Sequence, residues 1–182
     1  MIVAQIEDKL IKDIFKYAQL EVLTPGRLGI FRKGTKESII QELNQVDVNT
    51  FINIDTKEEY DNWFDQEVLK FHKNIFPLYR ENLTVKEGNP YSYSTRLYTS
   101  YLKFICVRTP VYTMRDNLVN IVHPIISNTY LSSYPQLGIK SVSQIKSRKT
   151  YYEIVEFYRK QLKEDLSDFN REILDMEIGV EV

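Results

Sequence analysis

Residues 55–79 read DTKEEYDNWFDQEVLKFHKNIFPLY, and the rest of the chain is best understood around this stretch. Its apolar and aromatic side chains recur at three- and four-residue spacing, which is the pattern of one buried stripe along an α-helix. Asp55 and Glu58 stand at capping-box spacing, where carboxylates accept hydrogen bonds from free backbone N–H groups. Pro77 lacks an N–H group and predicts a kink in the last part. The stripe comprises Tyr60, Trp63, Phe64, Val68, Phe71, His72, Ile75, Phe76 and Tyr79.

Similar stripes predict further helices on both sides of this one. They fall at about 6–18, 39–46, 95–108, 124–131, 151–162 and 169–176. Residues 51–54 fit a brief strand, but four residues alone do not decide it. We therefore predict a mainly α, single-domain orthogonal helical bundle with at most one short strand pair. Residues 55–180 form its core in this interpretation, and residues 1–50 pack as a peripheral N-terminal lobe.

The composition is that of a globular protein of 182 residues, with 43% hydrophobic and 27% charged side chains. The net charge is −1, so the chain lacks the strong positive charge typical of nucleic-acid-binding domains. Such a partner then requires basic groups gathered on one face. The thirteen tyrosines suit either half-buried helix faces or a binding surface, because each has an apolar ring and a polar hydroxyl.

The cysteine content and the hydropathy of the chain indicate its cellular compartment. Cys106 is the single cysteine and lies in an apolar run, which predicts a buried thiol in a reducing environment. No stretch approaches the eighteen apolar residues of a membrane span, and the N-terminus does not resemble a signal peptide. We predict a cytoplasmic protein with no membrane partner.

Metal and acid–base chemistry receive little support from the sequence. Two histidines and one cysteine are too few for a Cys/His zinc site, and we predict neither a metal nor a cofactor. His72 lies on the apolar stripe, which favours a core histidine. His123 precedes Pro124, which favours a structural hydrogen bond over catalysis. Asp61 and Asp65 lie one turn apart but off the stripe, which favours a solvated helix face over a metal pair.

The order of motifs from Tyr91 to Leu131 resembles that of the helix-hairpin-helix DNA glycosylase superfamily. A polar turn, Ser92-Tyr-Ser94, leads into a helix bearing Arg96 and Lys103, and Val122-His-Pro-Ile-Ile126 opens the next helix. The likeness extends over roughly residues 60–180 to a group of bacterial helical proteins with degenerate versions of the same motifs. It implies a helical body that holds nucleic acid.

Three departures from that family bear on catalysis. Ser92 and Ser94 replace the glycines whose backbone amides approach a DNA phosphate, and a side chain restricts that approach. Arg96 stands where the family has its nucleophilic lysine, and a guanidinium does not form a Schiff base. Ile126 stands where the family has its catalytic aspartate. The resemblance therefore implies that base excision by the family mechanism is lost, and we lean towards a non-enzyme.

The sequence leads to one preferred function and two alternatives. We predict a non-catalytic module that binds DNA or RNA, although acidic neighbours such as Glu153 and Glu156 also fit a solvated helix face. One alternative is a protein-interaction or accessory factor of phage or mobile-element type that uses tyrosines as anchors. The other is a degenerate glycosylase-like enzyme. The predicted nucleic-acid-binding residues are Ser92, Ser94, Arg96, Lys103, Lys140, Lys146, Arg148 and Lys149.

Overall fold

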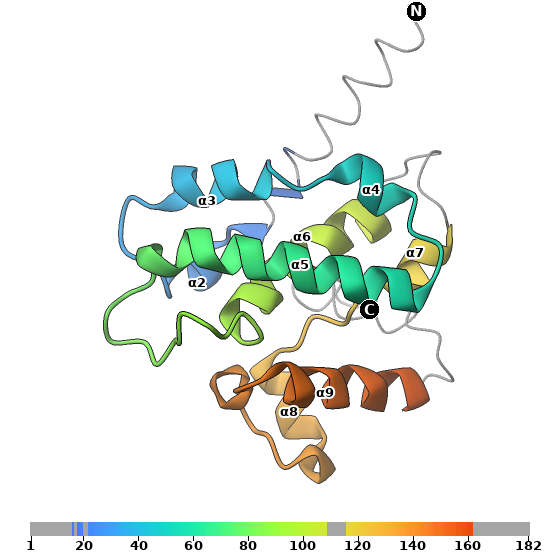
Figure 1. The fold of residues 1–182 in the computed structure, drawn as a ribbon. Coiled ribbons are helices and arrows are strands. Elements are labelled where there is room, and N and C mark those ends of the chain that lie inside the picture. Colours follow the sequence, from blue (N-terminus) through green and yellow to red (C-terminus); the bar gives the residue numbers. More distant parts are fainter. Residues whose placement is uncertain (1–15, 17, 20–21, 109–115, 162–182) are drawn as a thin grey trace, which may run out of the picture.

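The computed structural model describes residues 16, 18–19, 22–108 and 116–161, and over these residues the fold is mainly helical, as predicted (Figure 1). The predicted helix at 169–176, nearly all of the one at 6–18 and the side chain of Cys106 lie outside the described residues. The elements are α2 (Pro25–Leu28), α3 (Lys36–Leu43), α4 (Val48–Ile52), α5 (Lys57–Ile75), η1 (Phe76–Leu78), α6 (Tyr93–Arg108), α7 (Asp116–Ile121), α8 (Asn128–Ser133), η2 (Pro135–Leu137), η3 (Val142–Gln144) and α9 (Arg148–Gln161).

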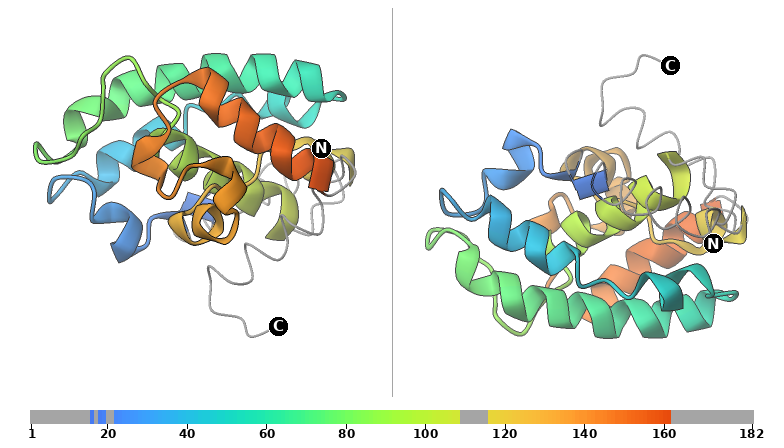
Figure 2. Two further views of the ribbon diagram at one scale, coloured as in Figure 1. Left: turned by 90° about the horizontal axis from the view of Figure 1, so that it is seen from below. Right: turned by 90° about the horizontal axis from the view of Figure 1, so that it is seen from above.

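Helix α5 lies between two layers of shorter elements. In Figure 1, α3 and α4 lie above it, α6 lies behind it, and α8 and α9 lie beneath it. Figure 2 shows the same order: α9 lies in front of α3 in the view from below and behind it in the view from above, while α5 runs along one edge of both views. Within the described ranges, β pairing is limited to an isolated antiparallel bridge between Phe31 and Tyr79. Helix α5 therefore offers one side to each layer.

The start of α5 is one residue later than the sequence suggested. Thr56, not Asp55, is the N-cap, and its hydroxyl accepts from the backbone N–H of Glu59 at 3.2 Å. The Glu59 carboxylate accepts in return from the N–H of Thr56 at 3.1 Å. Asp55 and Glu58 are also three residues apart, so the sequence allows a capping box at either pair. The backbone forms the capping box with Thr56 and Glu59.

Replacing Thr56 with alanine is expected to lower the free energy of unfolding by about 1 kcal/mol, because the Glu59 N–H then loses its acceptor. Urea unfolding followed by circular dichroism measures this. Thr24→Ala is the matched control, since Thr24 precedes α2 without a side-chain cap hydrogen bond, and we expect it to change little. Equal losses in the two variants would contradict the capping role.

The end of α5 follows from Pro77. The last α-helical hydrogen bond runs from the Phe76 N–H to the His72 carbonyl. Because Pro77 has no N–H to donate, the α-helix ends at Ile75 and the chain continues as the 3₁₀ turn η1. The turn brings Tyr79 back to Phe31, where the two rings stack with centroids 4.7 Å apart. The predicted kink is thus a change of helix type that joins α5 to the segment before α3.

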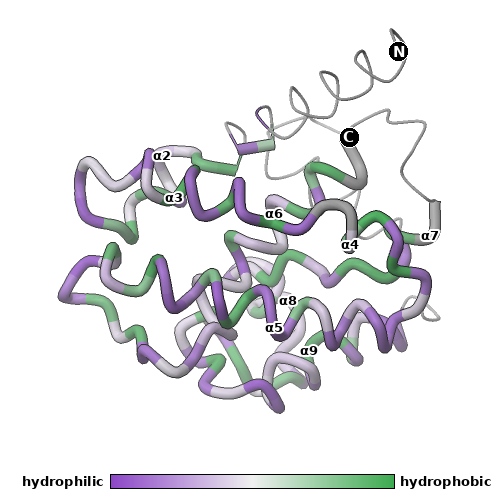
Figure 3. The backbone as a smooth tube through the Cα atoms, turned by 45° about the horizontal axis from the view of Figure 1, so that its top comes forward, coloured by the Kyte–Doolittle hydropathy of each residue, from purple (hydrophilic) through white to green (hydrophobic). Residues whose placement is uncertain are grey.

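A single cluster of buried side chains runs through the described helices. From α5 it takes Tyr60, Phe64, Val68, Phe71 and Ile75, as the stripe predicts. Figure 3 shows the resulting alternation of hydrophobic and hydrophilic stretches along this helix. Residues of the predicted N-terminal lobe belong to the same cluster, namely Ala18, Val22, Leu23, Phe31, Ile39, Leu43 and Val46.

One local prediction was wrong, and the structure decides a second segment that the sequence left open. The segment after α7 does not form a helix from Pro124; residues 123–127 are non-helical, and α8 begins only at Asn128. Ser127 sets that start, because its hydroxyl accepts from the backbone N–H of Tyr130 at 3.3 Å. Residues 51–54 hold the end of α4 rather than a strand, because Asp47 caps that helix through the N–H of Thr50.

Candidate functional site

The first group of predicted site residues lies in the interior of the protein. The Ser94 hydroxyl is buried and lies 2.6 Å from His72 Nδ1 and 2.7 Å from the Tyr79 hydroxyl. His72 Nε2 donates to the backbone carbonyl of Lys86 at 3.0 Å, so Nδ1 is the nitrogen that accepts from Ser94. His72 is the core histidine that the sequence predicted, and burial lowers its pKa. Ser94 therefore links α5 to α6.

The other members of this group are not on an open surface either. Ser92 is buried, and the side chain of Lys103 is 0% exposed in the middle of α6. Arg96 is half-buried, and burial lowers its pKa. A phosphate contact needs a donor that reaches solvent, so Ser92, Ser94 and Lys103 do not offer one in this conformation. The structure does not assemble these residues into an outward-facing hairpin.

The second group lies on the surface within one short segment, residues 140–149, which we call the basic turn. Lys140, Lys146, Arg148 and Lys149 are all exposed there. The side chain of Lys149 is 85% exposed and has a loose contact of 3.9 Å to Glu153. The structure thus brings four of the eight predicted residues together on the surface, whereas Ser92, Ser94 and Lys103 are buried.

The backbone of the basic turn is held in place by side-chain amides. Gln144 Oε1 accepts from the N–H groups of Lys140 at 2.7 Å and Ser141 at 3.2 Å, which confirms the capping-box spacing read from the sequence. Asn128 Oδ1 accepts from the Val142 N–H at 2.9 Å, and Asn89 donates to the Ile145 carbonyl at 3.0 Å. These bonds fix the turn against α8 and the loop before α6, with its lysines directed outward.

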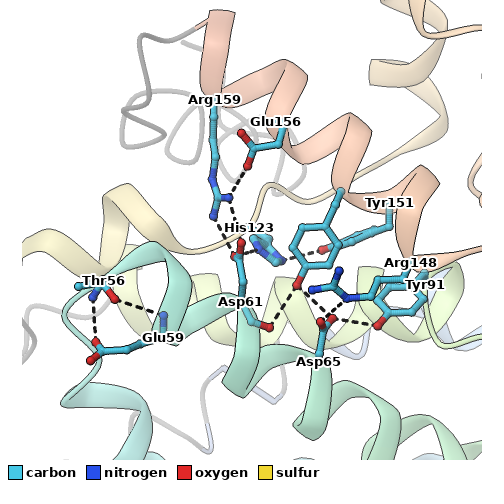
Figure 4. Close-up of polar contacts among 11 residues, drawn as sticks. Thr56, Glu59, Asp61, Asp65, Tyr91, His123, Arg148, Tyr151, Glu156 and Arg159 are labelled. Carbon is cyan, nitrogen blue, oxygen red and sulfur yellow. Dashed lines mark hydrogen bonds and ion pairs between the residues drawn. The ribbon is translucent and has the colours of Figure 1, made fainter.

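A polar cluster around Asp61 joins α5 to α9 (Figure 4). His123 Nε2 lies 2.7 Å from Asp61 Oδ1, and Arg159 donates to both carboxylate oxygens at 3.0 and 3.2 Å. On its other side, His123 Nδ1 lies 3.1 Å from the Tyr151 hydroxyl. Arg159 also donates to Glu156 at 2.6 Å. We call Asp61, His123, Tyr151 and Arg159 the Asp61 cluster.

The pKa shifts in this cluster agree on its charge state. Burial alone would raise the pKa of Asp61, but hydrogen bonds from His123 and Arg159 outweigh burial and lower it. Burial lowers the pKa of His123, against the opposing effect of Asp61. Burial alone would lower the pKa of Arg159, whereas its bonds to Asp61 raise it. At neutral pH the cluster therefore holds an ionised carboxylate, a charged guanidinium and a neutral imidazole.

Asp65, one turn further along α5, forms a second polar contact with α9. The hydroxyls of Tyr91 and Tyr152 lie 2.9 and 3.0 Å from Asp65 Oδ1. Arg148 Nε donates to Asp65 Oδ2 at 2.6 Å, and its guanidinium lies 4.3 Å from the centre of the Tyr152 ring. Arg148 belongs to both features, because it is part of the basic turn and holds the first turn of α9 to α5.

The solvated face predicted for Asp61 and Asp65 was wrong. Both carboxylates face α9 and are about four-fifths buried, with side chains 20% and 19% exposed. The apolar stripe of α5 marks only one of its packed sides. A second side, which carries Asp61 and Asp65, is covered by α9. A signal was present in the chain: Asp61 and Asp65 are four residues apart, and so are Arg148 and Tyr152, which bind the same carboxylate from α9.

The acid–base groups of the Asp61 cluster are largely buried among the described residues. The His123 side chain is 0% exposed and is enclosed by edge-on contacts from Tyr60, Phe64 and Tyr152. The cavity between α3 and α5 shares no residue with the cluster. The geometry therefore confirms the structural hydrogen bond predicted for His123.

The described residues offer neither a metal centre nor a membrane-spanning helix. No group of three or more His, Cys, Asp or Glu side chains there is arranged to hold a metal ion. No helix in that part of the chain is long and apolar enough to cross a membrane.

Comparison with known proteins does not assign the chain to a family. No protein-family model, curated protein or solved structure matches the chain significantly. Its function is therefore inferred from the geometry of its own residues.

Proposed function

We propose that this chain is a non-catalytic helical module that binds nucleic acid through its basic turn. The observation that carries the proposal is the exposure of Lys140, Lys146, Arg148 and Lys149 on one rigid segment. Phosphate contacts are electrostatic and independent of sequence, so a local group of cations suffices even when the net charge is −1. The partner class is a phosphodiester backbone, of DNA or RNA.

The charge balance of the basic turn supports this assignment. No carboxylate among the described residues pairs with Lys140 or Lys146, and Lys149 reaches Glu153 only at 3.9 Å. On a solvated helix face that is neutralised by its own acidic residues, the lysines would form closer ion pairs with carboxylates. Arg148 is engaged by Asp65 but keeps a side chain 56% exposed. When a lysine without a close ion pair binds a phosphate, no strong existing interaction has to be broken.

The alternatives receive less support from the described surface. A protein interface anchored by large apolar groups needs a patch, and Leu69 is the one large hydrophobic side chain that is exposed in the described ranges. A glycosylase-like site needs Lys103 and His123 within reach of a substrate, and both side chains are fully buried.

The test is a titration of a fluorescein-labelled duplex of about 20 base pairs at salt concentrations from about 50 to 200 mM. We expect the affinity of the wild type to fall steeply with salt. Removing three cations in Lys140→Ala/Lys146→Ala/Lys149→Ala should reduce the slope of log K against log[salt] by about 0.9 for each phosphate that these lysines neutralise. A single-stranded RNA of equal length, run in parallel, shows which nucleic acid is bound more tightly.

The matched control is Lys33→Ala/Lys70→Ala/Lys73→Ala, which removes the same charge from exposed lysines before α3 and on α5. We expect this variant to bind nearly as well as the wild type, because its lysines do not belong to the basic turn. Affinity that does not change with salt would overturn the proposal. So would an equal loss of binding in the two triple variants.

A further inference from the structure

We propose that the layer formed by residues 128–161 is a pH-sensitive element that is released from α5 when His123 takes up a proton. This segment, which we call the α8–α9 layer, contains α8, η2, η3 and α9 and forms the lower layer in Figure 1. The proposal concerns the conformation of the fold and holds whether or not the basic turn binds nucleic acid.

The layer is internally connected, contributes apolar side chains such as Val142, Ile154 and Val155 to the common core, and makes its polar contacts with α5 through a few side chains. Within it, the ring of Tyr134 packs edge-on against Phe157 and Tyr158, with centroids 5.3 and 5.6 Å apart. Towards α5 it presents Arg148, Tyr151, Tyr152 and Arg159 to two carboxylates and to His123, as Figure 4 shows. His123 lies in the chain segment that leads from α7 into this layer and touches both sides of the junction.

Within the part of the chain that the structure describes, the groups that face His123 come from α5 and α9. From α5 come the Asp61 carboxylate and the rings of Tyr60 and Phe64, with Asp65 further off. From α9 come Tyr151, Tyr152 and the Arg159 guanidinium. The tyrosines of α9 have their pKa values raised by burial and stay neutral in acid.

The hydrogen bonds specify a neutral imidazole with its proton on Nε2. An ionised carboxylate only accepts, so His123 Nε2–H donates to Asp61, and Nδ1 accepts from the Tyr151 hydroxyl. A second proton on Nδ1 would force the Tyr151 hydroxyl to turn its hydrogen away and lose this acceptor inside a fully buried site. It would also place a second cation beside Arg159, whose charge already balances Asp61. Protonation is therefore disfavoured while the layer is docked and is unhindered once His123 reaches water.

The direction of the pH effect and the pH range in which it acts follow from this difference between the docked and the released state. A buried histidine whose pKa is lowered from 6.5 contributes stability that is fully present above pH 6.5 and is lost as the pH falls below it. At about pH 5.0 an ordinary imidazole favours the released state by a factor of about 30. Asp61 behaves differently, because its lowered pKa keeps its contribution intact until the pH falls below 3.8. Between about pH 7.5 and 5.0 the Asp61 cluster therefore responds through His123.

Hydrogen–deuterium exchange of the whole chain at about pH 7.5 and 5.0, corrected for intrinsic exchange rates, tests the proposal. We expect the protection of amides in α9 to fall by about 10- to 30-fold at the lower pH. This loss should exceed that of amides in the centre of α6, where the other buried histidine with a lowered pKa, His72, bonds to Ser94. An equal loss in α6 and α9 would show that the whole fold opens together, and that result would overturn the release of a separate layer.

The variant His123→Gln retains an amide donor for Asp61 but has no titratable ring. We expect its α9 protection to change less than about 3-fold between the two pH values. The matched control is His72→Gln, because His72 is equally buried but joins α5 to α6 and the Lys86 carbonyl. This control should keep the pH response of α9, and loss of the response there would contradict the role of His123.

A second measurement needs no variant, in case His123→Gln does not fold. Imidazole nitrogen spectra of the wild type report the tautomer and the protonation of each histidine. We expect His123 to remain the neutral Nε2–H form at about pH 6.0, where an ordinary imidazole is mostly protonated. A His123 that titrates in the folded chain with a pKa at or above the ordinary 6.5 would overturn the proposal.

Discussion

Replacing Phe64 with alanine is expected to lower the free energy of unfolding by about 4 kcal/mol. The Phe64 side chain is 0% exposed and lies at the junction of α5, α6 and α9. Its ring centroid is 4.5 Å from that of His123 and 6.0 Å from that of Tyr151. Truncation removes the ring and leaves a cavity between rigid aromatic neighbours, which cannot collapse to fill it.

Urea unfolding followed by tryptophan fluorescence measures this effect, since Trp63 is the single tryptophan and neighbours Phe64 in sequence. Leu69→Ala is the matched control on the same helix. Its side chain is 52% exposed, so we expect a change of about 0.5 kcal/mol or less. Comparable losses in the two variants would contradict the packing described for α5.

Replacing Asp61 with alanine is expected to cost about 3 kcal/mol, because it leaves the Arg159 guanidinium buried without its main counter-ion. The Arg159 side chain is 3% exposed, and among the described residues Glu156 is its remaining ion-pair partner once Asp61 is gone. His123 loses the acceptor of its Nε2–H at the same time. Thermal unfolding at about pH 7, where the lowered pKa of Asp61 keeps its carboxylate ionised, measures the loss.

Two further variants separate charge from hydrogen bonding in this prediction. Asp61→Asn keeps an oxygen that accepts from His123 but removes the charge that balances Arg159, so we expect an intermediate loss. Glu153→Ala removes a carboxylate whose side chain is 61% exposed and whose contact with Lys149 is long, and we expect almost no change. If Asp61→Ala lowered the stability as little as Glu153→Ala, the Asp61 cluster would not contribute to the stability of the fold.

Much of the helical body could be predicted because its signals are local. The stripe of α5, the position of Pro77 and the spacing of Ser141 and Gln144 depend on neighbours within a few turns, and each prediction agrees with the structure. Boundaries were less well determined. Asp55 and Thr56 are both good N-caps, and Pro124 is a good first helical residue, so the choice between starts fell to packing.

The candidate site was predictable only in part, for a related reason. Lys140, Lys146, Arg148 and Lys149 are close in sequence, so a turn that keeps its polar character brings them together without help from the rest of the fold. Ser94 and Lys103 belong to a helix that is covered on more than one side, and no local pattern reveals how many sides of a helix are covered.

Local patterns in the chain are thus enough to establish that it is helical, where the apolar stripe of α5 runs and that basic residues gather in the segment 140–149. The attachment of Asp61 and Asp65 to α9, and the enclosure of His123 between Asp61 and Tyr151, arise from packing in three dimensions. Asp61 contacts His123 and Arg159, which lie 62 and 98 positions away along the chain. Periodicity records which side of a helix is apolar, whereas the identity of the partner on its polar side depends on where a distant helix packs.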